Sequence, residues 1–256
     1  MAIATIPGWI GSSAVAETGE RWMSAARRAV RLSPSGWMSE MAGRSKEILV
    51  TLNGSNNGFS STWLVEHIEG LVNGNITGHV IKIVITSGTT LINDPSNLEE
   101  EVIYIPDTWG ACTNIIIENH GRILGRGGNG GGQWRGGEPG YHAIQNDLGT
   151  KLIIRNHGII AGGGGGGSSA HREISGGREY GGGGGAPLGL GGRAPYANGN
   201  NASIDNPGSG AEYAGKGGGW GQNGANDSYS GGKAGMAVRN KAPTWEVRGT
   251  IYGAVP

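Results

Sequence analysis

The sequence predicts two unlike domains. We expect a mixed α+β domain at the N-terminus, followed by a glycine-rich domain of packed polyglycine-II (polyproline-II-type) helices, with little regular secondary structure in the C-terminal half. Three observations support this. Residues 1–50 have a helical pattern, short apolar runs separated by turn residues extend over 48–120, and blocks of pure glycine dominate 121–256. The domain boundary is therefore placed near residue 120, giving domains 1–120 and 121–256.

The composition departs strongly from that of an ordinary globular protein. The 256 residues include 54 glycines and a single phenylalanine, and 16% of them are charged, whereas ordinary domains have about 7% glycine and about 25% charged residues. A chain of this length has room for a sizeable core, but large apolar side chains are sparse in its second half. Something other than a conventional hydrophobic core must therefore order that half.

The N-terminal region has start and stop signals for a helix. Ser12 or Ser13 can cap a segment that runs to about Leu32, where Ser33-Pro34 ends it. Gly19 weakens the prediction, because glycine is unfavourable inside a helix. We expect this region to be mainly helical. Its buried face would combine one large aromatic residue with several small ones, a pattern that suits close packing against another surface: Val15, Trp22, Ala26, Ala29 and Val30.

Strand signals follow. Short apolar runs lie at 48–50, 80–85, 102–105 and 115–117, with Asn, Gly and Ser between them. The motif Asn-His-Gly begins at Asn119 and again at Asn156, and each copy continues into Gly-x-Ile-x-Gly. Two copies are too few for a regular solenoid, so we interpret them as related edges of the fold.

The glycine blocks allow two interpretations. Glycine-rich sequence usually forms a flexible linker. Here, however, the blocks are interrupted by distinct segments that contain aromatic residues. Strand-like sequence also returns at 152–154 and 245–247, and both features favour an ordered structure. Polyglycine helices could satisfy their backbone groups from chain to chain, because no side chains hold the segments apart. The glycines expected to form this scaffold are Gly162, Gly163, Gly164, Gly165, Gly182, Gly183, Gly184 and Gly218.

Between the glycine blocks lie five loops, at about 133–139, 168–180, 193–203, 211–215 and 221–230. They combine aromatic, charged and small polar residues, the types that make rigid anchors with adaptable hydrogen bonding in binding loops. The alternative is that they are solvated loops without a partner. The residues we expect to bind a partner are Trp134, Arg135, His171, Arg172, Tyr180, Tyr196, Tyr213, Trp220 and Tyr229.

Several classes of function find no support. The formal net charge is zero, so nothing draws the chain generally to nucleic acid or anionic membranes. No apolar stretch approaches the length of a membrane span. Cys112 is the single cysteine, and no metal-binding, cofactor-binding or catalytic motif stands out. We expect a binding protein without cofactor, metal or enzymatic activity. An RNA-binding segment, suggested by two Arg-Gly-Gly triplets, is a distant alternative because acidic residues neutralise the region.

Long and specific words in the chain resemble a known family. They are IPGWIGSSAVAETG at 6–19, RWMSAA at 21–26, MAGRS at 41–45, HAIQND at 142–147, GGGGGAP at 181–187, APTWE at 242–246 and GTIYG at 249–253. Together they are similar to the receptor-recognising adhesins of T-even-type bacteriophages, and the likeness spans the whole chain.

The resemblance implies a place and a partner at each end of the molecule. The protein would be made in the host cytoplasm and sit in the virion, at the tip of the trimeric long tail fibre, attached through domain 1–120. Candidates for docking onto the distal fibre protein are Trp9, Trp22, Trp37 and Met38. The loops of 121–256 would choose the receptor and so the host range: a porin-like outer-membrane protein first, lipopolysaccharide second. A tail-fibre assembly chaperone is the alternative function.

Overall fold

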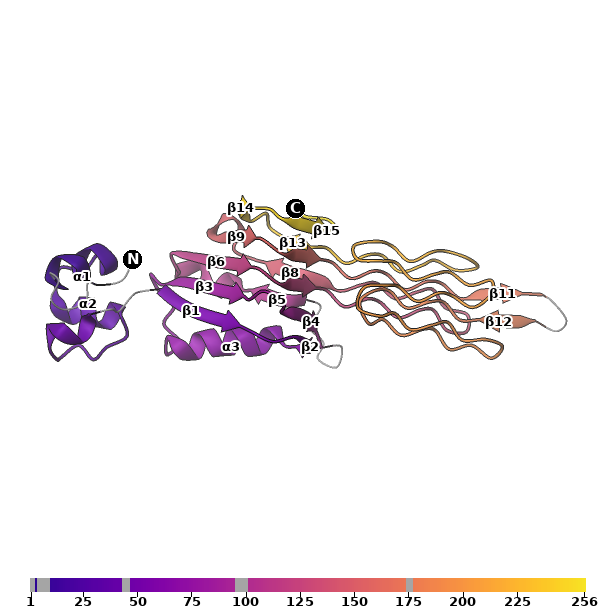
Figure 1. Cartoon of the computed structure of the whole chain (residues 1–256), viewed down its shortest axis with the longest axis horizontal. Helices are drawn as coiled ribbons and strands as arrows, with labels where there is room; N and C mark the ends of the chain where they lie inside the picture. Colours follow the sequence, from indigo (N-terminus) through magenta and orange to yellow (C-terminus); the bar gives the residue numbers. More distant parts are fainter. Residues whose placement is uncertain (1–2, 4–9, 43–46, 95–100, 174–176) are drawn as a thin grey trace.

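The computed structural model describes residues 3, 10–42, 47–94, 101–173 and 177–256. The molecule is elongated (Figure 1), with a small helical part at one end, β-sheets in the middle and extended glycine-rich segments at the other end. The hairpin of β11 and β12 lies at the far tip of these segments, whereas the C-terminus returns to lie beside the sheets. The two ends of the long axis therefore carry quite different parts of the sequence.

The helical part contains two short helices instead of one long one. They are α1 (Ile10–Thr18) and α2 (Met23–Ala29), followed by the 3-10 helix η1 (Met38–Met41). Gly19 ends α1, since it takes a φ of +75° and its N–H bonds back to the Val15 carbonyl. The residue that weakened the sequence prediction thus breaks the helix.

A buried arginine holds the loop after α2 in place. The guanidinium of Arg27 donates to the carbonyls of Ser33, Ser35 and Trp37 at 2.6–3.0 Å and forms an ion pair with Glu40 at 2.6 Å. The remaining core of this part is small and consists of Ile3, Ala14, Ala26, Val30 and Met41. With so few apolar groups to bury, the helical part depends on this arginine network for its shape.

Three parallel sheets make up the middle of the molecule. The first runs in the order β1 (Glu47–Leu52), β3 (Val80–Ile85), β6 (Asn114–Asn119), β9 (Leu152–Asn156), β14 (Thr244–Val247). The second runs β15 (Thr250–Tyr252), β10 (Ile159–Ala161), β7 (Arg122–Leu124), β4 (Thr90–Asn93), β2 (Asn56–Phe59). The third runs β13 (Val238–Asn240), β8 (His142–Asn146), β5 (Glu101–Ile105). As the chain proceeds, it returns to these sheets in turn and adds one further strand to a sheet each time.

Side chains of equivalent positions stack from one pass to the next. Ile83 pairs with Ile117, which pairs with Ile154, and all three are fully buried in one continuous core. At the following corner Asn119 donates from its side-chain amide to that of Asn156 at 2.8 Å. The two Asn-His-Gly motifs are related edges, as the sequence predicts, and they occupy the same corner of successive layers, one stacked on the other.

A helix covers part of this core where only short strands were predicted. Helix α3 (Ser61–Leu71) begins at Ser60, whose hydroxyl accepts from the Trp63 N–H, and it buries Leu64 and Ile68. Both signals are present in the sequence, because a serine cap followed by apolar residues at i,i+4 spacing favours a helix. Two single-turn 3-10 helices, η2 (Asp107–Ala111) and η3 (Gly149–Lys151), complete the middle region.

The predicted fold class is wrong. The protein consists mostly of parallel β-sheet with few helices, and the sheets continue through the second half of the chain instead of stopping near residue 120. Beyond that residue lie β7 to β10 and β13 to β15, together with the antiparallel pair β11 (Ala170–Arg172) and β12 (Arg178–Tyr180). A C-terminal half of polyglycine-II helices with little regular structure is not what the chain forms. The strands of the second half are short apolar segments between glycine-rich stretches, so the high glycine content made the sequence look poor in regular structure.

The glycine segments extend from the ends of these strands toward the far tip. Their backbones bond laterally to one another: Gly128 donates to Gly164, Gly167 to Gly183, and Gly183 to Gly215, at 2.8–2.9 Å. Most of these residues are buried by their neighbours' backbones. Backbone hydrogen bonds between close segments therefore order a region that lacks large side chains.

Candidate functional site

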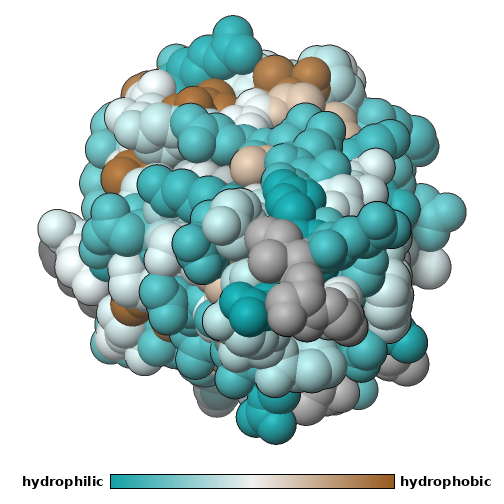
Figure 2. Space-filling view, turned by 90° about the vertical axis from the view of Figure 1, so that its right-hand side faces the viewer, coloured by the Kyte–Doolittle hydropathy of each residue, from teal (hydrophilic) through white to brown (hydrophobic). Residues whose placement is uncertain are grey.

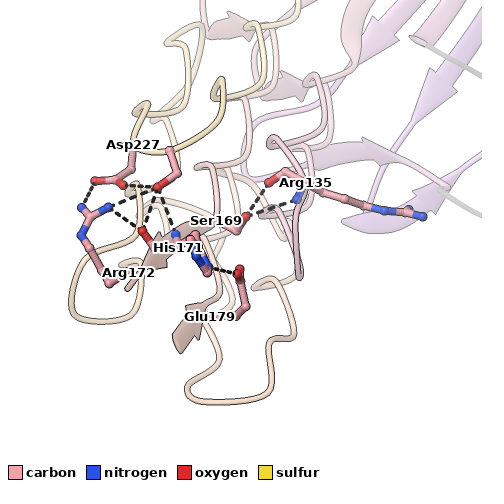
Figure 3. Close-up of polar contacts among 7 residues, drawn as sticks. Arg135, Ser169, His171, Arg172, Glu179 and Asp227 are labelled. Atoms are coloured by element: carbon pink, nitrogen blue, oxygen red, sulfur yellow. Dashed lines mark hydrogen bonds and ion pairs between the residues drawn. The ribbon is translucent and has the colours of Figure 1, made fainter. Parts of the chain in front are cut away.

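The far tip gathers most of the predicted partner-binding residues. On hairpin β11–β12, His171 lies directly opposite Glu179, and its Nδ1 contacts the Glu179 Oε1 (Figure 3). The ring of Trp134, 53% exposed, lies against the His171 ring with centroids 4.6 Å apart. Glu179 itself is 5% exposed, and its other carboxylate oxygen is buried without a hydrogen bond. A buried carboxylate and a histidine thus support an exposed tryptophan.

Three tyrosines from three different loops meet beside this pair. Tyr180 is 1% exposed, and the rings of Tyr196 and Tyr213 each approach it edge-on at 5.1 Å. Tyr196 is 52% exposed and Tyr213 38% exposed. The sequence predicts that all three contact a partner, but Tyr180 is buried in the structure. Its ring packs against both of the exposed rings.

Arg172 is engaged within the molecule. It forms an ion pair with Asp227 at 2.8 Å, bonds to the Ser228 hydroxyl at 3.2 Å and lies over the Tyr213 ring. Burial alone would raise the pKa of Asp227, but the hydrogen bonds from Arg172 and Ser228 outweigh it and the pKa is lowered. The hydrogen bond to Asp227 correspondingly raises the pKa of Arg172. This ion pair joins hairpin β11–β12 to loop 221–230.

A shallow pocket of about 260 Å³ opens between these groups. Its walls include Gln133, Trp134, Arg178, Glu179, Pro195 and Tyr196. Arg178 lies over the Tyr196 ring at 4.4 Å and donates to its hydroxyl at 2.9 Å. Arg178, Glu179 and Asp227 are not among the binding residues predicted from the sequence. Arg178 and Glu179 fall beside the predicted loop residue Tyr180, so their position in a loop was the only available signal.

The remaining predicted residues lie apart from this pocket. Trp220 is half-buried near the sheets, with its indole N–H donating to the Ile204 carbonyl and its ring against Tyr252. The Arg135 backbone bonds to Ser169, while its side chain points away from the cluster (Figure 3). Tyr229 is half-buried, in the same loop as Asp227.

The predicted scaffold glycines all lie where a side chain cannot fit. A Cβ atom at any of them would come within 3.0 Å of a backbone atom of a neighbouring segment, for example the Gly218 carbonyl in the case of Gly164. The eight positions are Gly162, Gly163, Gly164, Gly165, Gly182, Gly183, Gly184 and Gly218. They are sites of close backbone approach that only glycine tolerates.

The helical part exposes large apolar side chains at the opposite end of the molecule. Trp22 is 80% exposed, Trp37 79% and Met38 43%. Trp9, the fourth predicted docking residue, lies outside the described residues. Exposed tryptophans on a part this small indicate an interaction surface.

Neither a metal site nor a membrane span is found within the described parts of the chain. No three His, Cys, Asp or Glu side chains are grouped there so as to hold a metal ion. The helices described are all too short or too polar to cross a membrane.

Comparison with known proteins identifies the family. The family model described as phage tail fibre adhesin Gp38 matches residues 47–256, and the model for the N-terminal domain of the same family matches residues 1–42. The chain belongs to the Gp38 phage tail fibre adhesins.

Individual relatives agree. The chain is 38% identical to the receptor-recognizing protein gp38 of Salmonella phage S16, over 96% of this chain and 97% of that protein. It is similar to a chain in the crystal structure of the gp37-gp38 adhesin tip complex of the bacteriophage S16 long tail fiber, with a TM-score of 0.75, 36% identity and full coverage of both chains.

The family resemblance read from the sequence is therefore confirmed, and so is the function of a receptor-recognising adhesin on the long tail fibre of a virion. The family is one of adhesins rather than enzymes. The adhesin exposes aromatic side chains at both ends of its long axis.

Proposed function

We propose that the tip around hairpin β11–β12 binds an outer-membrane protein of the bacterial host and so determines host range. A porin-like protein is the first candidate, and lipopolysaccharide, alone or as co-receptor, the second. The observation that carries the proposal is the pair of half-exposed rings of Trp134 and Tyr196, held from below by buried groups at the end remote from the helical part. Rigid aromatic anchors of this kind dominate binding energy in protein interfaces.

The surrounding surface suits reversible binding. The face at the tip is mainly hydrophilic, with only scattered hydrophobic residues (Figure 2). Interfaces that form and dissociate have a polar rim around a few anchors, whereas permanent ones are more apolar. Several fibres on one virion would multiply the residence time through effective concentration. The adhesin would therefore act by surface complementarity, without cofactor or chemistry.

We further propose that the helical part attaches the adhesin to the trimeric distal protein of the long tail fibre. The S16 relative was crystallised in a gp37-gp38 complex, and Trp22 and Trp37 are exposed at the end away from the tip. Division into an attachment domain, 1–120, and a receptor-binding domain, 121–256, is part of the same proposal. In it, the sheets act as a stalk that separates the two surfaces.

Binding of the fibre-tip complex to enterobacterial cells tests the receptor proposal. Cells lacking individual porins are compared with the parent strain, using wild-type adhesin and the Tyr196→Ala variant. We expect deletion of one porin to abolish binding and Tyr196→Ala to weaken it. Undiminished binding across all porin deletions would exclude a porin and favour lipopolysaccharide.

A further inference from the structure

Two arginines face each other across hairpin β11–β12. Arg172 pairs with Arg178 in the strand register, and like charges directly opposite one another destabilise a sheet. Arg172 is neutralised by Asp227 at 2.8 Å. Of the acidic residues that the structure describes, none forms an ion pair with Arg178. Arg178 therefore has no ion-pair partner among the described residues although it faces another arginine, and departures from local rules of this kind concentrate at functional sites.

The Arg178 guanidinium is held in a fixed position. Arg178 is stacked on Tyr196 and donates one hydrogen bond to its hydroxyl, and Tyr196 rests in turn on the buried ring of Tyr180. A guanidinium has five N–H donors in a rigid fork, so most of them are left for another acceptor. Little side-chain entropy would be lost when a ligand binds to a group already held in this way.

The pocket beside Arg178 indicates the size and charge of that acceptor. Trp134 and Tyr196 form exposed aromatic walls, and the volume is about 260 Å³. Glu179 also lines the pocket, but it is 5% exposed and one carboxylate oxygen is taken by His171, so Arg178 is the charge that an incoming group meets. Arg178 is a single cation, and the buried carboxylate of Glu179 lies beside it. Such a site suits a ligand group with one negative charge better than a phosphate, which carries more negative charge.

We propose that this pocket receives an aspartate or glutamate side chain from an extracellular loop of the protein receptor. Its carboxylate binds Arg178 through the free N–H groups, and its methylene carbons pack between Trp134 and Tyr196. Arg–carboxylate pairs of this geometry give orientation as well as affinity. The inference rests on the proposed function, because it names the chemistry by which the same tip recognises its receptor.

The test compares charge variants of the adhesin in the assembled fibre tip, measured by binding to host cells. Arg178→Gln is expected to weaken binding by about tenfold or more, since hydrogen bonds to charged groups are stronger than those between neutral groups. Arg178→Lys, which keeps the charge but loses the planar fork of donors, should show an intermediate loss. Arg248→Gln is the matched control, because Arg248 also stacks on an aromatic ring, that of Trp245, but lies between β14 and β15 in the sheet region. This variant should bind like wild type. Melting temperatures verify that each variant is folded.

The Glu179→Gln variant shows whether the group that enters the pocket is negatively or positively charged. A carboxylate occupant predicts equal or tighter binding for this variant. If Glu179→Gln binds more weakly while Arg178→Gln binds as well as or better than wild type, the occupant is cationic and the inference is wrong.

Treatment of the cells identifies the source of the negative charge. Amidation of surface carboxylates with carbodiimide and an amine should abolish binding, whereas cells whose lipopolysaccharide lacks core phosphates should bind normally. The opposite result would assign Arg178 to lipopolysaccharide and overturn the proposal. If wild-type adhesin binds through a porin but Arg178→Gln is unaffected, the proposed function stands and only this inference fails.

Discussion

The Trp134 ring lies 4.6 Å from the His171 ring, at an angle of 34° between their planes. Trp134 reaches this position with a φ of +61°, in the left-handed region that a bulky residue rarely adopts. Glu179 lies opposite His171 in the hairpin, and its carboxylate contacts the Nδ1 atom of that histidine. The most exposed ring at the tip is thus supported by an unusual backbone conformation and by a histidine whose position is fixed from below.

Removing the ring of His171 while keeping a hydrogen-bond donor should loosen Trp134. We expect His171→Gln to weaken cell binding a few-fold, because a ring–ring contact is worth about 0.5–1.5 kcal/mol, with a melting temperature near that of wild type. Trp134→Ala sets the maximum loss. Binding of His171→Gln equal to wild type would show that Trp134 needs no support from this ring.

Tyr180 is predicted to affect binding only through its neighbours. Tyr180→Ala should lower the free energy of unfolding by about 3–5 kcal/mol, the usual cost of truncating a buried aromatic residue, and weaken cell binding as Tyr196 and Tyr213 lose their support. Tyr180→Phe keeps the ring and should bind normally. Denaturant unfolding and cell binding together check this, and loss of binding in the Phe variant would instead make Tyr180 a direct receptor contact.

A single methyl group at a buried glycine should be more damaging than one on a helix. At Gly164 a Cβ would overlap the Gly218 carbonyl, whereas at Gly70 in α3 no atom lies within 4 Å. Gly164→Ala is expected to destabilise the adhesin by about 3 kcal/mol or more, and Gly70→Ala to stabilise it by up to about 1 kcal/mol. Thermal unfolding measures both, and similar melting temperatures would contradict the close packing of the glycine segments.

Stability should fall at acid pH because of Glu118. Hydrogen bonds from Lys82 and then from His120 lower the pKa of Glu118 from 4.5 to about 2. Its stabilising contribution is therefore complete above pH 4.5 and is lost as the pH falls toward 2, and it amounts to about 3 kcal/mol at low salt. Urea midpoints at several pH values should show this loss. Glu118→Gln should be less stable at neutral pH, and its stability should change less over the acid range.

Trp22 and Trp37 are predicted to act in assembly and not in folding. Because they are about 80% and 79% exposed, replacement by alanine should leave the melting temperature unchanged but weaken attachment to the distal fibre protein by about tenfold or more, as expected for aromatic hot spots. Trp134→Ala is the control, because this tryptophan is 53% exposed but lies at the far tip, outside the proposed attachment domain. Co-purification with the fibre protein measures the effect, and retention of both variants on the fibre would exclude this docking surface.

Much of the candidate site could be predicted from the sequence, but not the roles within it. Aromatic and charged residues between glycine blocks indicated the loops, and Trp134, Tyr196 and Tyr213 are indeed exposed. Tyr180 has the same residue type and the same kind of sequence neighbours, yet it is buried, because loops from distant segments close over it. Whether Trp134 and Tyr196 contact a receptor remains a prediction.

The sequence by itself determined the family, through long words spread over the chain, and the positions of glycine, which permit backbones to approach within the distance of a hydrogen bond. It also contained the apolar runs that form the early strands. Only the tertiary structure decided that the strands stack as parallel sheets into the second half and that Trp220 lies near the sheets. It also decided that Arg172 pairs with Asp227 while Arg178 forms no ion pair with any acidic residue that the structure describes. The physical reason is that strand stacking and charge pairing depend on contacts between residues far apart in the chain, as between Arg172 and Asp227, and local sequence patterns carry no information about such distances.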